Sequence, residues 1–197
     1  MDDKIANIIC KSIRLKIFEK NKVEDVSEGE NMRVVIYPGT FDPVTNGHIH
    51  IAERAGSLFD RVIIAVAAEN YKKNLFSLAE RIDLMKKSTK HIENIEVESF
   101  TGLLAEYAKG KDAQASIRGL RAVTDFEYEM QIAAMNKHLN KDMETIFLMT
   151  EGKYSFLSST MIKQVAMVGG SVKGLVPLIV EDSLKTKYKL SLEKDKS

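Results

Sequence analysis

Histidine, arginine, lysine and hydroxyl side chains are the residues of this 197-residue sequence whose spacing indicates chemistry on phosphate groups. The stretch Tyr37–His48 joins a β-branched run, Arg33–Ile36, to a helical apolar period that starts at Ile49. Free amide N–H groups and the positive end of a helix make a strand-to-helix loop of this kind a favourable binding site for phosphate. The P-loop and dinucleotide fingerprints are both absent, so this stretch represents another kind of phosphate site.

His48 is the residue of this stretch best suited to donate a hydrogen bond to phosphate. It lies three residues after Thr45, so both side chains point to one side of the first helical turn. Because a helix N-terminus disfavours imidazolium, we expect a neutral ring; a purely structural histidine is the alternative. The nearby His50 does not predict a metal site, because helical side chains two residues apart diverge and no third ligand is suitably spaced.

Further cationic and hydroxyl groups follow other predicted strands. Lys72 and Lys73 come after the second strand, and Arg118 and Arg121 flank a Gly-Leu pair after the fourth. A guanidinium group suits bidentate contact with phosphate, although each of these residues taken alone is an ordinary surface charge. Ser158–Thr160 supplies three consecutive hydroxyls, which hold a polyphosphate at a helix start or merely cap the helix.

Strand and helix signals alternate along the chain, which predicts an α/β fold. The expected strands are Arg33–Ile36, Arg61–Ala67, Ile95–Phe100, Ala115–Ile117 and Thr145–Met149, and helices are expected to begin near Ile49, Ser77, Leu103, Thr124, Ser158 and Pro177. Five such alternations predict a doubly wound, five-stranded parallel sheet. In these sheets ligands lie beyond the carboxyl ends of the strands, so the loops after strands one, two, four and five should converge on one large anion site.

Composition limits the classes of partner. A formal net charge of +1 predicts no global attraction to nucleic acid or membrane, and no apolar run approaches the ~20 residues of a membrane helix. A single cysteine suits a reducing cytoplasm. Residues 1–31 are rich in charge, and we expect a flexible, non-catalytic extension ahead of a domain over residues 32–197. A translation start upstream of Met32 would explain this extension.

Several motifs together carry a family resemblance. Gly39–His48 resembles the signature of the nucleotidyltransferase superfamily, in which a T/H-x-G-H tetrad opens the first helix, and Ser158–Thr160 resembles its second motif. With Ile117–Arg121, Asp125–Gln131 and Phe156–Thr160, the chain is similar to bacterial phosphopantetheine adenylyltransferases over about residues 32–190. The resemblance implies a Rossmann-like nucleotidyltransferase fold. It also implies synthesis of dephospho-coenzyme A and pyrophosphate from ATP and 4′-phosphopantetheine.

The resemblance also implies roles for individual residues. The catalytic residues would be His48, as transition-state stabiliser, Lys72 and Arg118. The residues expected to bind 4′-phosphopantetheine are Thr40, Lys72, Leu104, Arg118 and Asn136. Those expected to bind ATP are Thr40, Phe41, His48, Gly119, Leu120, Arg121, Glu129, Tyr154, Ser155, Phe156, Leu157, Ser158, Ser159 and Thr160. Mg²⁺ would arrive with ATP rather than bind a dedicated protein site, and the assembly would be a cytoplasmic homohexamer.

Two alternatives remain open from the sequence. One is another nucleotidyltransferase with the same signature, such as a glycerol-3-phosphate cytidylyltransferase or a nicotinate-mononucleotide adenylyltransferase. The other is a non-catalytic sensor of nucleotide or coenzyme A on the same fold. The Ile117–Arg121 and Asp125–Gln131 segments favour the pantetheine enzyme, and the presence of His48, Lys72 and both arginines argues against loss of catalysis.

Overall fold

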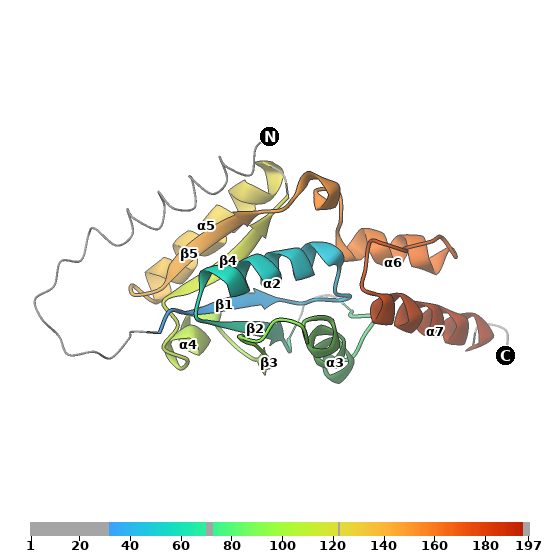
Figure 1. The fold of residues 1–197 in the computed structure, drawn as a ribbon, viewed down its shortest axis with the longest axis horizontal. Helices are drawn as coiled ribbons and strands as arrows, with labels where there is room; N and C mark the ends of the chain where they lie inside the picture. The colour runs from blue at the N-terminus through green and yellow to red at the C-terminus, as the bar shows by residue number, and fades with distance from the viewer. Residues whose placement is uncertain (1–31, 70–72, 122, 195–197) are drawn as a thin grey trace, which may run out of the picture. The chain divides into compact units, whose positions relative to one another are not determined.

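A parallel β-sheet forms the centre of the domain. The computed structural model describes residues 32–69, 73–121 and 123–194, and its five strands lie in the order β3-β2-β1-β4-β5 (Figure 1). The strands are β1 (Val34–Gly39), β2 (Arg61–Ala67), β3 (Ile95–Phe100), β4 (Ala115–Leu120) and β5 (Glu144–Met149). The apolar runs of β1 and β2 are buried almost throughout, as expected for central strands covered on both faces.

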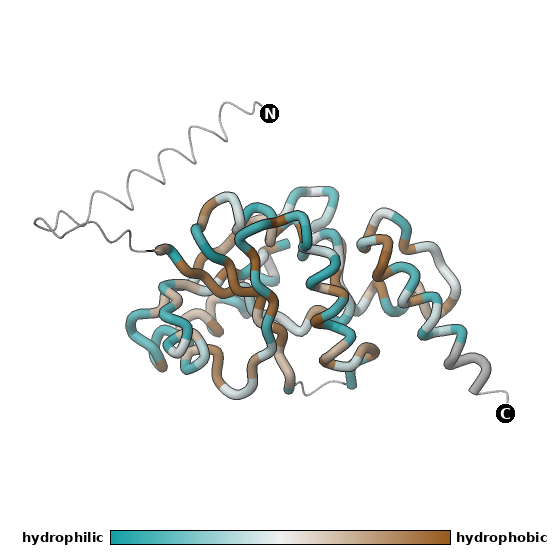
Figure 2. Tube along the Cα trace, turned by 60° about the horizontal axis from the view of Figure 1, so that its bottom comes forward, coloured by the Kyte–Doolittle hydropathy of each residue, from teal (hydrophilic) through white to brown (hydrophobic). Residues whose placement is uncertain are grey.

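Helices cover both faces of this sheet, which confirms the doubly wound α/β prediction. The helices are α2 (Asn46–Leu58), α3 (Leu78–Ser88), α4 (Leu104–Lys109), α5 (Val123–Leu139), α6 (Ser159–Met167) and α7 (Leu178–Lys194), with a short 3₁₀ turn η1 (Gly152–Tyr154). One core cluster joins α2, α3, α6 and α7 to the sheet through residues such as Ala52, Met85 and Leu184. A second cluster on the other face includes Ala105 and Ala108 of α4. Figure 2 shows the hydrophobic colour gathered on the central strands.

Several boundaries differ from the sequence prediction, and β1, for example, runs to Gly39 rather than ending at Ile36. β4 runs to Leu120 rather than ending at Ile117, because Arg118, Gly119 and Leu120 pair with Phe147–Met149 of β5. Arg118 therefore lies within a strand and not in the loop after it. α5 begins at Val123, so Thr124 lies inside the helix instead of capping it. The predicted caps at Ser77 and Ser158 are confirmed, since each side chain accepts a hydrogen bond from a first-turn amide.

The strand order reverses between β1 and β4, which are neighbours in the sheet although β2 and β3 separate them in the chain. The loops after β1 and β4 leave this point in opposite directions, and a crevice opens between them. The predicted N-terminal extension, residues 1–31, lies outside the described residues. Among the described helices none is long and apolar enough to cross a membrane.

Candidate active site

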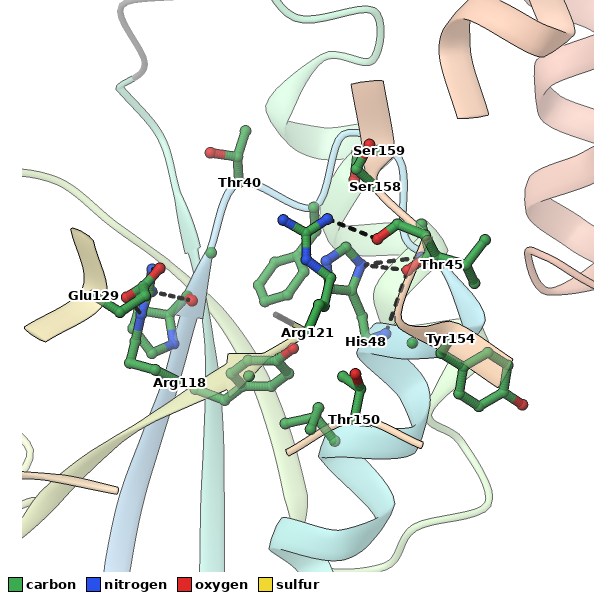
Figure 3. A pocket seen from close by; sticks show the side chains of 18 residues that line it. Thr40, Thr45, His48, Arg118, Arg121, Glu129, Thr150, Tyr154, Ser158 and Ser159 are labelled. Carbon is green, nitrogen blue, oxygen red and sulfur yellow. Dashed lines mark hydrogen bonds and ion pairs between the residues drawn. The ribbon is translucent and has the colours of Figure 1, made fainter. Parts of the chain in front are cut away.

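A cleft of about 280 Å³ lies at the carboxyl ends of β1 and β4 (Figure 3). It brings together eleven side chains or backbone segments that the sequence singled out: Thr40, Phe41, His48, Arg118, Gly119, Arg121, Glu129, Tyr154, Leu157, Ser158 and Ser159. They come from β4, α2, α5 and α6 and from the loops after β1, β4 and β5, so the predicted convergence is confirmed for three of the four loops, and no described residue of the loop after β2 lines the cleft. Lys72 lies outside the described residues.

The start of α2 fixes the tautomer of His48. Thr45 is the N-cap, and its backbone N–H donates to His48 Nδ1 at 3.0 Å. A ring nitrogen that accepts a hydrogen bond carries no proton, so the proton of the neutral ring resides on Nε2. Nε2 is consequently a donor, which is the property that a phosphate oxygen requires. The Phe41 ring lies edge-on to the imidazole, with centroids 5.1 Å apart, and fixes its plane.

Electrostatics keep this ring neutral. Burial, with a smaller contribution from the positive charge of Arg121, lowers the pKa of His48 from 6.5 to about 4. This direction agrees with the neutral ring expected from the sequence, although burial rather than the helix N-terminus is its main cause. α2 also carries no acidic residue in its first turn, so the positive end of the helix is not neutralised there.

Arg118 is held in place by three hydrogen bonds. Nε and one terminal nitrogen donate to the two carboxylate oxygens of Glu129 at 2.5 and 2.6 Å, and Nη1 donates to the carbonyl of Pro38 at 3.1 Å. Glu129 comes from α5 and Pro38 from β1, so the guanidinium group joins the two elements that border the switch point (Figure 3). Five N–H groups are available on the side chain, and those not used here remain available to a ligand.

Arg121, which precedes α5, is held in the same manner by a carboxylate that lies one helical turn before Glu129. Its Nε and Nη2 donate to Asp125 at 2.9 and 3.0 Å, and Nη1 donates to the carbonyl of Leu157 at 2.8 Å. Asp125 and Glu129 are four residues apart and share one helix face. A single helix thus orients both guanidinium groups of the described cleft.

Hydroxyl groups form the opposite wall. Ser158 caps α6 by accepting from the amide of Met161 at 3.1 Å, and Ser159 donates to the carbonyl of Pro43 at 2.8 Å. The second contact ties α6 to the loop after β1. Tyr154 closes this side near Gly47, where an added Cβ would lie 3.6 Å from the Tyr154 side chain.

The remaining predicted site residues do not line the cleft. They are Leu104, Leu120, Asn136, Ser155, Phe156 and Thr160. Leu104 opens α4 and packs on the second core cluster, and Asn136 is buried on α5. Phe156 and Thr160 are exposed beside the cleft. Their proposed contacts with substrate stay predictions.

Other residues line or support the cleft although sequence patterns did not single them out. Tyr37 and Thr150 line it. Asp42 and Arg81 are buried nearby: Arg81 donates to the carbonyl of Thr40, and Asp42 pairs with Lys163 of α6 at 2.7 Å. Two sequence signals could have identified Asp42 and Arg81. One is an acidic residue in the signature loop, and the other is an arginine on the apolar stripe of α3. Their partners are far away in the sequence, so spacing alone could not reveal them.

The described residues contain no group of three or more His, Cys, Asp or Glu side chains close enough together to hold a metal ion. Glu129 is the acidic side chain that lines the described cleft, and both of its oxygens accept from Arg118. Mg²⁺ commonly uses substrate phosphates and water as ligands, with only one or two protein carboxylates. The donor set of this cleft fits an ion that is carried by phosphates.

Comparison with known proteins identifies the family. A model of cytidylyltransferase-like proteins matches residues 36–165. A phosphopantetheine adenylyltransferase of Moorella thermoacetica is 56% identical over 157 residues, covering 80% of this chain and 98% of that protein. The chain belongs to the phosphopantetheine adenylyltransferase family. Another member, from Caldanaerobacter subterraneus, is 55% identical over 160 residues, with 81% of this chain and 100% of that protein covered.

A solved structure with low sequence identity supports the fold. A protein from Vibrio parahaemolyticus, described as a nicotinate-nucleotide adenylyltransferase, superposes with a TM-score of 0.61 at 16% identity. The alignment covers 80% of this chain and 95% of that one. At this identity the likeness concerns the nucleotidyltransferase fold alone.

Proposed function

We propose that the chain transfers the adenylyl group of ATP to 4′-phosphopantetheine. A phosphate oxygen of phosphopantetheine forms a bond to the α-phosphorus of ATP, the bond from that phosphorus to the bridging oxygen of the β-phosphate breaks, and pyrophosphate leaves. The second product is dephospho-coenzyme A. Membership of the phosphopantetheine adenylyltransferase family supports this reaction over the cytidylyltransferase and sensor alternatives.

The reaction requires no general base from the protein. A phosphate monoester has a second pKa near ~6, so the attacking group is an anion at pH 7. The protein must instead bring two anions together in line and stabilise charge on the α-phosphate oxygens. This requirement agrees with a cleft whose described donors are an imidazole, two arginines and hydroxyl groups.

The orientation of His48 is the observation that carries the proposal. Because Nδ1 accepts from the Thr45 amide, Nε2–H is free to donate to an α-phosphate oxygen as its charge grows. Arg118, together with Lys72, holds the attacking phosphate. Arg121 and the hydroxyls of Ser158 and Ser159 receive the departing pyrophosphate.

Magnesium, assembly and location complete the proposal. Mg²⁺ bound to the ATP phosphates would neutralise charge on the leaving pyrophosphate, with Ser158 and Thr40 as the neighbouring hydroxyls of the described cleft. The enzyme is proposed to act in the cytoplasm as a homohexamer, and exposed apolar residues of α5 such as Tyr128, Met130 and Met135 suit a subunit contact. Light scattering coupled to size exclusion should give six times the mass of one chain.

One assay tests the reaction. Pyrophosphate release is measured with ATP and phosphopantetheine, with CTP and glycerol 3-phosphate, and with ATP and nicotinate mononucleotide. We expect turnover with the first pair and at most trace release with the others. Turnover confined to another pair, or nucleotide binding with no release at all, would contradict the proposal.

Two histidine variants test the role of His48. Removing one preorganised donor lowers turnover by about 10²–10³, so His48→Ala should lose this much in kcat while ATP still binds. His91→Ala is the matched control, because His91 is exposed and pairs with Glu53 away from the cleft. Near-normal turnover of His48→Ala would show that the donor is another group.

A further inference from the structure

A buried arginine that contacts the backbone of the cleft residue Thr40 takes no direct part in the reaction proposed above. Arg81 of α3 is 1% exposed, and its Nη1 donates to the carbonyls of Thr40 and Ala67, each at 2.8 Å. Ala67 ends β2, and Thr40 directly follows β1. One guanidinium group thus joins the carboxyl ends of the two strands that lead into the substrate loops.

The Thr40 carbonyl lies in the signature loop, next to a residue with an unusual backbone conformation. It belongs to the peptide group that joins Thr40 to Phe41, and Phe41 has a φ of +51°, in the left-handed region that non-glycine residues rarely adopt. The ring of Phe41 lies edge-on to His48. Fixing this peptide therefore supports the side chain that sets the plane of the imidazole donor.

The positive charge of Arg81 has no carboxylate partner in the part of the chain that the structure describes. Asp42 is the nearest acidic influence, but its carboxylate accepts from the amides of Leu75 and Phe76 at 3.0 and 2.9 Å and pairs with Lys163. Asp42, Lys163 and Arg81 together carry one excess positive charge. Burial lowers the pKa of the Arg81 guanidinium, but an arginine side chain still stays protonated at neutral pH.

An arrangement of this kind is unfavourable for the empty protein. Arg81 Nε is also buried and has no hydrogen-bond partner among the described protein atoms. Burying a charge without a partner of opposite sign destabilises a fold, and a neutral side chain of similar length would avoid this. The same charge becomes favourable when a polyanion binds next to it, because a low-dielectric surrounding screens it poorly.

We propose that Arg81 is a positioning residue for adenylyl transfer: it fixes the Thr40–Phe41 peptide beside His48 and supplies positive charge, without a carboxylate partner, behind the Thr40 wall of the cleft. The inference rests on the proposed function for the identity of the anions. Arg81 contributes to the cleft in two ways, through hydrogen bonds to the two carbonyls and through its positive charge. Each can be removed without the other.

Two substitutions at this position test the proposal. Arg81→Lys keeps the charge, but its shorter side chain does not carry a nitrogen to the place from which Nη1 donates to both carbonyls, whereas Arg81→Met removes charge and donors together. Arg61→Met is the matched control, because Arg61 starts β2, at the amino end of the strand and away from Ala67, and pairs with Glu96 near solvent. ATP affinity is measured by calorimetry and kcat by pyrophosphate release, both per mole of native protein as judged by circular dichroism.

We expect Arg81→Lys to bind ATP within about threefold of the unmodified chain and to lose kcat about 10- to 100-fold, the usual effect of losing a charged hydrogen bond. Arg81→Met should lose ATP affinity by a similar factor as well. If Arg81→Met does not fold, the division between affinity and kcat in Arg81→Lys decides. An unchanged kcat in Arg81→Lys, or equal ATP affinity in both folded variants, would overturn the proposal.

Failure of the proposed reaction and failure of the role of Arg81 give different experimental results. If the unmodified chain releases no pyrophosphate from ATP and phosphopantetheine, the proposed function fails whatever happens at Arg81. Calorimetry with ATP then still tests the charge, since it needs no turnover. Loss of ATP affinity in Arg81→Met but not in Arg61→Met would support that part of the inference, and equal affinities would overturn it.

Discussion

Replacing His48 by glutamine should change how the stability of the protein depends on pH. Burial, aided by Arg121, lowers the pKa of His48 to about 4, against about 6.5 in the unfolded chain. Protonation is therefore easier in the unfolded state than in the folded one. The stability supplied by the neutral ring is fully present above about pH 6.5 and is lost as the pH falls toward 4.

The size of this effect follows from the two pKa values. One pKa unit corresponds to about 1.4 kcal/mol, so the full difference amounts to roughly 3 kcal/mol. About 2 kcal/mol of this falls between pH 6.5 and 5, a range in which most carboxylates stay ionised. Glutamine keeps an oxygen that can accept from the Thr45 amide but does not titrate. The unmodified protein should therefore lose about 2 kcal/mol more than His48→Gln over this range.

Urea unfolding at fixed protein concentration measures the difference. Circular dichroism is the suitable signal, because the chain contains no tryptophan. Contributions of other titrating groups are common to both proteins and cancel when the two curves are subtracted. Parallel stability curves from pH 7 to 5 would refute the reasoning, because they would mean that the ring titrates equally in the folded and unfolded states.

Two further substitutions probe the surroundings of the cleft. Gly39→Ala should destabilise the protein by about 1–3 kcal/mol, because an added Cβ would lie 2.7 Å from the Phe41 ring, and thermal unfolding against Gly152→Ala, where nothing lies within 4 Å, checks this. Glu129→Gln should lower kcat/KM about 10- to 100-fold, because it weakens the bidentate anchor of Arg118, and steady-state kinetics with unchanged kcat/KM would contradict that role.

The sequence was sufficient to predict the architecture because the signals were local. β-branched runs, capping residues such as Ser77 and Ser158, and the spacing of apolar positions each depend on neighbours within a few residues. Strand order was not predictable in this way. That β4 pairs with β1 depends on packing across the whole sheet, and only the general rule about switch points led from alternation to the position of the cleft.

Residues that contact a ligand by themselves were predictable from the sequence. Pairs in which one residue holds another in position were less predictable. His48 and the arginines were identified from their place after strands. Glu129 and Asp125 hold those arginines, and Arg81 reaches the carbonyl of Thr40 from α3. These contacts depend on how the elements pack, and the spacing of residues along the chain does not reveal them. An arginine on an apolar helix stripe resembles a solvent-exposed charge until its carbonyl partners are known.

These pairings alter the physical description of the cleft. The sequence suggested a collection of free cations, but Arg118 and Arg121 each have a carboxylate from α5 as partner, so their net charge is largely neutralised before substrate arrives. What they offer is fixed N–H geometry, and preorganised donors lower a barrier without reorganising during the reaction. Net positive potential at the described cleft must then come from the positive end of α2, whose first turn holds no acidic residue, and from the charge of Arg81 behind Thr40. If geometry and charge are divided in this way, Glu129→Gln should lower kcat/KM without abolishing ATP binding, whereas Arg81→Met should weaken ATP binding itself.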